Sequence, residues 1–72
     1  NAYERLIKAR EKSSTEIGRA LRSLQGLSNP LENISDFFVA KKEANKVDNL
    51  TDAQKQEVIN LKTTYYVSKR MA

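Results

Sequence analysis

Six positively charged side chains near the start of this chain are its strongest candidates for binding chemistry. They are Arg5, Lys8, Arg10, Lys12, Arg19 and Arg22. On a helix, steps of three and four place Arg5, Lys8 and Lys12 on one face. Basic groups gathered in this way attract phosphates, anionic lipid head groups or acidic protein surfaces. The stretch therefore indicates an anion-binding face, and the alternative is a solvated face whose charges are balanced by Glu4 and Glu16.

Two pairs of adjacent aromatic residues are the candidates for binding a protein partner. They are Phe37 with Phe38 and Tyr65 with Tyr66. Neighbouring residues on a helix point about 100° apart, so both members of a pair are buried only where the helix is covered over a wide arc. The expected inner lines are Leu31, Ile34 and Phe38 in one helix and Val58, Leu61 and Tyr65 in another. Phe37 and Tyr66 then flank the core and are available to a partner, unless both pairs simply widen the core.

Catalytic and metal-binding residues are not indicated anywhere in the sequence. The 72 residues include no cysteine and no histidine, which excludes disulfides, thiolate nucleophiles and thiolate or imidazole zinc sites. The acidic residues are spread along the chain, and the two glycines, Gly18 and Gly26, do not form a phosphate-binding loop. We therefore expect no enzyme activity, no cofactor and no small-molecule substrate.

Helix-start signals divide the chain into the elements that would position these side chains. Asn29 precedes Pro30, and Glu32 stands where it answers the cap. Thr51 and Gln54 form a second capping box. With the apolar periodicity, these signals predict three helices over residues 2–25, 30–47 and 51–70.

The first of these helices has two interpretations, because the polar stretch REKSSTEIG interrupts its apolar stripe. Serine costs a helix only about half a kcal/mol relative to alanine, so one continuous helix over residues 2–25 is the prediction. The alternative is a break near Ser13, with Ser13 capping a helix that begins at Glu16. In that case residues 15–21, TEIGRAL, resemble the first motif helix of helix-turn-helix DNA-binding proteins. That resemblance implies a tight turn directly after Leu21, whereas the helical period continues through RSLQ.

Chain length and short connections complete the predicted architecture. A chain of 72 residues forms one domain at most, and the few residues between helices make consecutive helices antiparallel. The prediction is an all-α, up-down-up three-helix antiparallel bundle, or hairpin, with a long first helix. Domains this short gain little net stability from their own core, so we expect a partner or self-association to complete it.

These features favour a non-enzymatic helical module for protein interaction, assembly or adaptor work. The alternative is a basic helical module that binds nucleic acid or an anionic membrane surface through its first helix. No apolar run reaches the roughly 20 residues that span a bilayer, and no signal-peptide pattern is present in the given sequence. The sequence therefore predicts a soluble chain whose compartment stays unknown.

Overall fold

The computed structural model describes residues 1–27 and 35–71, which form four α-helices and no strand. They are α1 (Ala2–Glu11), α2 (Thr15–Ser23), α3 (Asp36–Ala44) and α4 (Asp52–Met71). The predicted all-α class is confirmed. The prediction of three helices with a long first helix is wrong, because the described part of the chain contains four helices and the longest is α4, with 20 residues. None of these four helices is long and apolar enough to cross a membrane.

The first predicted helix is broken between Glu11 and Thr15, so the prediction of one continuous helix is wrong. Ser14 has an extended backbone, and its hydroxyl accepts a hydrogen bond from the Ile17 amide at 3.2 Å. The alternative of a break near Ser13 is confirmed, although the cap is Ser14 and α2 starts at Thr15. Folding back brings both halves onto one core, which a straight helix about 36 Å long would not allow.

Of the two other predicted caps, only the one at Thr51 falls within the described residues. Thr51 and Gln54 form the predicted reciprocal capping box, with bonds of 2.9 and 3.1 Å. The expected start of the second predicted helix, at Asn29, Pro30 and Glu32, lies outside the described residues. Helix α3 begins at Asp36 behind a Ser35 cap and ends at Ala44, so it is shorter at its carboxyl end than the predicted limit of residue 47.

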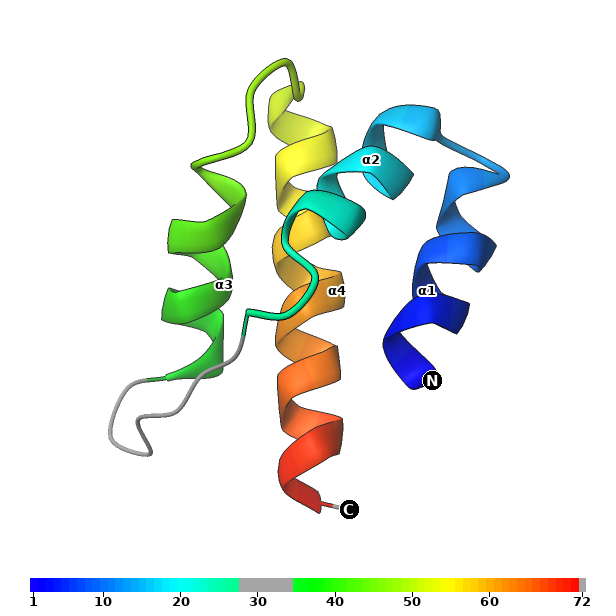
Figure 1. The fold of residues 1–72 in the computed structure, drawn as a ribbon. Helices are drawn as coiled ribbons and strands as arrows, with labels where there is room; N and C mark the ends of the chain where they lie inside the picture. The colour runs from blue at the N-terminus through cyan, green and yellow to red at the C-terminus, as the bar shows by residue number, and fades with distance from the viewer. Residues whose placement is uncertain (28–34, 72) are drawn as a thin grey trace.

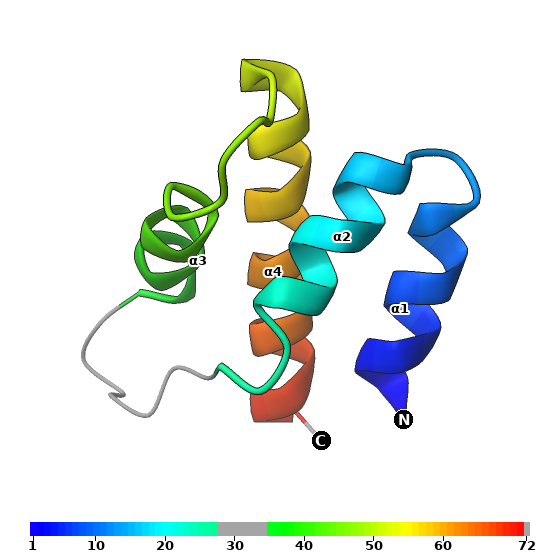
Figure 2. The ribbon, with the colours of Figure 1, turned by 45° about the horizontal axis from the view of Figure 1, so that its top comes forward.

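Helix α4 is the centre of the arrangement. Figure 1 shows α3 and α1 standing on either side of it, and Figure 2 shows α2 crossing between α1 and α4. Helix α3 packs along α4, whereas α2 packs on both α1 and α4. The radius of gyration is 11.5 Å, close to the value of about 11 Å expected for one compact domain of this length.

The hydrophobic core receives large side chains from three helices and small ones from the fourth. Its members are Tyr3, Ile7, Ile17, Ala20, Leu21, Leu24, Ala40, Ala44, Val58, Ile59 and Tyr66. Only Ala40 and Ala44 come from α3, beside the buried side chain of Glu43. Val39 packs against this core while partly buried, whereas Phe37 and Phe38 of the same helix are exposed.

Candidate functional site

The exposed aromatic face of α3, which consists of Phe37 and Phe38, is the first candidate site. Their residue exposures are 47% and 52%. Phe37 lies outside the core as expected, whereas Phe38 was predicted to point inward and is exposed as well. The amine of Lys42 lies 5.5 Å from the centre of the Phe38 ring, a cation–π distance. Two phenyl rings and a cation are thus presented together on one short helix.

The inner side of α3 explains why both phenylalanines are outside. Ala40, Glu43 and Ala44 recur at steps of three and one, and these three residues are buried against the rest of the fold. Small alanines let α3 lie close to α4. Where α3 begins and α4 ends, the Arg70 guanidinium donates hydrogen bonds of 2.9 to 3.1 Å to the Asp36 carboxylate. This ion pair fixes the start of α3, directly before the aromatic face.

The tyrosine pair does not belong to this aromatic face. Tyr66 is only 3% exposed, and its hydroxyl donates to the Glu43 carboxylate at 2.7 to 2.8 Å. Tyr65 is partly buried, with its ring edge-on to Tyr3 at a centroid distance of 4.9 Å. The predicted inner line through Leu61 and Tyr65 is wrong, because both are only partly buried. The buried line of α4 is Val58, Ile59, Lys62 and Tyr66.

A buried polar cluster, consisting of Lys62, Glu43, Tyr66 and Tyr3, connects three helices. The Lys62 side chain is completely buried, and its amine lies 3.5 Å from a Glu43 carboxylate oxygen. It lies over the Tyr3 and Tyr66 rings, 4.9 and 4.8 Å from their centres. It also donates to the Leu24 carbonyl at the carboxyl end of α2, at 3.3 Å, where a cation is favoured by the helix dipole. The cluster thereby ties α2 to the α1, α3 and α4 residues around it.

Burial dominates the electrostatics of this cluster. Loss of solvation lowers the pKa of Lys62, and the neighbouring Glu43 carboxylate opposes that change. Burial raises the pKa of Tyr3, and the charge of Glu43 raises it further. The pKa of Tyr66 is raised for the same reason, with an added contribution from its hydrogen bond to Glu43.

A lysine with a lowered pKa acts as a nucleophile in some enzymes, and Lys62 has such a lowered pKa. A catalytic amine must be reached by a substrate, and the Lys62 side chain is completely shielded. Tyr3 instead uses its hydroxyl to bond the Leu21 carbonyl at 2.5 Å. Every buried polar side-chain atom in the described residues has a partner. The geometry is that of a saturated structural network.

The six basic residues differ in whether they make ion pairs within the described part of the chain. Arg22 is engaged, with ion-pair distances of 3.2 Å to Glu4 and 3.3 Å to Glu11, so it holds α2 against α1. A hydrogen bond from Gln25, with the charge of Arg22 as a further cause, lowers the pKa of Glu4. The other five are exposed and make no ion pair within residues 1–27 and 35–71: Arg5, Lys8, Arg10, Lys12 and Arg19.

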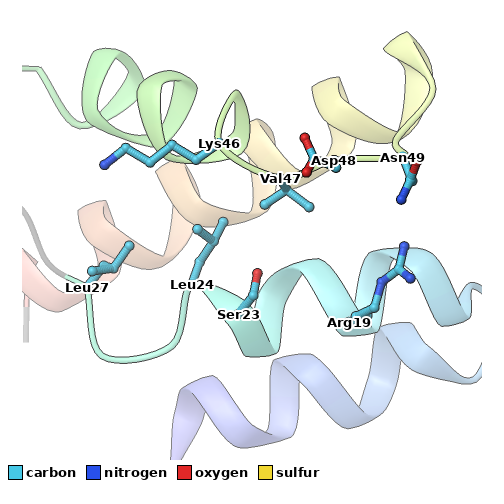
Figure 3. A pocket seen from close by; sticks show the side chains of 8 residues that line it. All are labelled: Arg19, Ser23, Leu24, Leu27, Lys46, Val47, Asp48 and Asn49. Atoms are coloured by element: carbon cyan, nitrogen blue, oxygen red, sulfur yellow. The ribbon is translucent and has the colours of Figure 1, made fainter.

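A pocket of about 430 Å³ lies between α2 and the connection from α3 to α4. Leu24 and Val47 line its middle, and Leu27 lies toward one end (Figure 3). Arg19 and Asn49 point toward one another at one end, and Lys46 extends at the other. Asn49 has a φ of 66°, a left-handed conformation that asparagine tolerates better than most residues, and this turn brings its side chain to the pocket.

Sequence reasoning missed the buried charges of Glu43 and Lys62, and it missed the pocket. Glu43 follows Ala40 by three positions, and Lys62 follows Val58 and Ile59 by four and three, so helical spacing placed both on core-facing lines. Charged residues are almost never fully buried without partners, and those partners come from other helices. Arg19 was named as a candidate anion-binding residue, but the pocket that it lines was missed because two distant segments form it.

Comparisons with protein-family models, with curated proteins and with solved structures found no match to this chain. Among the described residues, no three acidic side chains are grouped closely enough to hold a metal ion.

Proposed function

We propose that this chain is a non-enzymatic helical protein-interaction module that uses the aromatic face of α3 to bind a second copy or another protein. The observation that carries the proposal is the inverted amphipathicity of α3. Its buried side holds Ala40, Ala44 and the carboxylate-bearing Glu43, whereas Phe37 and Phe38 are about half exposed. Aromatic side chains are enriched at the centres of protein interfaces.

The size of the expected effect supports this role. Full burial of a phenylalanine side chain stabilises by about 1.5 to 3 kcal/mol, so covering the exposed half of each ring contributes about 1 kcal/mol. The neighbouring Lys41 and Lys42 are exposed, which adds positive charge beside the rings. A partner with an apolar centre and an acidic rim matches this surface best.

Light scattering across a concentration series tests the proposal. We expect the parent mass to rise with concentration, or with addition of a partner, and Phe37→Ser and Phe38→Ser to weaken that association. Val67→Ser is the matched control, because Val67 is an apolar residue of similar exposure, 42%, on a different helix, α4. A parent that is monomeric at all concentrations, together with phenylalanine variants that unfold, would make both rings ordinary core residues and end the proposal.

A second candidate function is binding of nucleic acid or an anionic membrane surface through α1. The observation that favours it is the exposure of Arg5, Lys8 and Lys12, none of which has an ion-pair partner in the described part of the chain. Replacing the three with glutamine should weaken binding to a DNA duplex or to anionic vesicles. It should also reduce the salt dependence by about one unit of slope per lost phosphate contact. Unchanged binding in the triple variant would exclude this face.

A further inference from the structure

We propose that the pocket between α2 and the α3–α4 connection binds a short acidic segment of another protein, with an aliphatic side chain between its acidic residues. This pocket shares no residue with the aromatic face of α3. The inference therefore stands independently of the proposed function.

The middle of the pocket is suited to an aliphatic side chain. Leu24 supplies a surface that is continuous with the core, where it is only 4% exposed, and Leu27 is exposed to 42%. Val47 faces Leu24 from the α3–α4 connection, and Leu27 extends the apolar surface toward the end where Lys46 lies (Figure 3). The volume of about 430 Å³ is within the roughly 300 to 1,000 Å³ of pockets that hold small ligands, and it is ample for a few side-chain atoms.

The ends of the pocket are suited to carboxylates. Arg19 and the Asn49 amide converge on one end, and Lys46 lies at the other (Figure 3). Neither Arg19 nor Lys46 is in an ion pair with any residue in the described ranges. The planar guanidinium presents several donors to one carboxylate, whereas the lysine acts as a compact point charge. Each cation is therefore free to meet one acidic side chain of an incoming segment.

Asp48 determines which anions fit between those ends. It lines the same pocket next to Val47, so two cations face one carboxylate. A continuous polyanion such as a nucleic-acid backbone would bring phosphates beside Asp48 and be repelled there. A peptide avoids this repulsion if its acids are at the two ends and its centre is apolar. The charge pattern thus favours an acidic protein segment over nucleic acid.

Peptide binding measured by fluorescence anisotropy and amide chemical shifts tests the assignment. The probe is a labelled Glu-Glu-Leu-Leu-Glu-Glu peptide, compared with Glu-Glu-Ser-Ser-Glu-Glu and Lys-Lys-Leu-Leu-Lys-Lys. We expect the first to bind with shift changes at Leu24, Leu27 and Val47. The serine peptide should bind at least about tenfold more weakly, since it has no aliphatic side chain to bury in the pocket. The lysine peptide should not bind.

Variants of the protein locate the site. Arg19→Gln and Lys46→Gln should each weaken binding about two- to fivefold, the range of exposed ion pairs. Leu27→Ser should weaken it about tenfold, and its amide spectrum should stay folded because Leu27 is already exposed. Lys8→Gln on α1 is the matched charge control and should leave binding unchanged.

Four results would overturn the assignment. They are no binding of the leucine peptide, equal binding of the serine peptide, an Arg19→Gln effect no larger than that of Lys8→Gln, and shift changes centred on Phe37 and Phe38. The last result would show that the acidic peptide binds at the aromatic face of α3 and not in the pocket.

Discussion

Two regions of this domain place residues where their types are uncommon, a buried polar cluster and an exposed aromatic face. At its centre lies the buried polar cluster, in which Lys62 is wholly shielded beside Glu43. On its outside lies the aromatic face of α3, with two phenylalanines about half exposed. A buried charge is tolerated only with partners, whereas an exposed apolar pair is tolerated without them but gains from a partner. The polar cluster is saturated with partners inside the fold, whereas our proposal gives the aromatic face a partner outside it.

Breaking the buried ion pair should have the largest effect on stability. Lys62→Met leaves the Glu43 carboxylate buried without its counter-charge, and removal of one partner from a buried pair costs about 3 to 5 kcal/mol. Urea unfolding measures the change. In Lys62→Met combined with Glu43→Gln, no buried charge remains and Tyr66 keeps an acceptor. We expect the double variant to be more stable than Lys62→Met alone, and additive losses would contradict the coupling.

The next largest effect on stability is expected at Gly18 in the α1–α2 hairpin. Helix propensity favours alanine at this position, whereas the packing against α1 favours glycine. Alanine favours a helix over glycine by about 1 kcal/mol. A Cβ at Gly18, however, would lie 2.3 Å from the Glu11 Cβ and 3.0 Å from its Cα. Because the α1 backbone must move, Gly18→Ala should lower the free energy of unfolding by about 1 to 3 kcal/mol. A stabilised variant in a thermal melt would show that α1 and α2 are not in close contact.

High pH should lower the free energy of unfolding, because the phenols of Tyr3 and Tyr66 stay protonated in the folded state. The pKa values of Tyr3 and Tyr66 are raised above the ordinary 10.0, so the folded state keeps protons that the unfolded chain loses above that pH. Stability is therefore fully present below about pH 10 and falls as pH rises beyond it. Lys62 has the opposite sign, because burial lowers its pKa, but one amine opposes two phenols.

Urea unfolding at about pH 8 and at about pH 11 measures this dependence. We expect a smaller loss of stability between the two values in Tyr66→Phe than in the parent, because one of the two phenols is gone. An equal loss in both proteins would show that Tyr66 does not titrate with folding.

Local signals in the sequence predicted part of this structure. The Thr51 and Gln54 capping box was predictable because both partners lie within one turn. The break at Ser14 was not, because a serine costs a helix little and the turn depends on Gly18 lying against Glu11. The inner face of α3 was misplaced because the large ring of Phe38 was preferred as core over the small side chain of Ala40, which is the buried one.

The candidate sites were predictable only where a single segment forms them. Phe37 and Phe38 could be named from their adjacency on one helix. The buried cluster requires Tyr3, Glu43 and Lys62 to meet from three helices far apart in sequence. The pocket likewise joins Arg19 to Lys46 and Asn49 across the fold. Such tertiary combinations leave no local pattern in one sequence.

The most direct test of the central claim compares thermal melts of two variants at one low protein concentration, followed by circular dichroism. We predict that the Phe37→Ser, Phe38→Ser double variant melts within a few degrees of the parent, since surface substitutions change stability by about 0.5 kcal/mol or less. Lys62→Met should melt far lower or be unfolded. The reverse order, with the phenylalanine variant unfolded and Lys62→Met unaffected, would contradict the claim that the polar cluster maintains the fold and the aromatic face serves contacts.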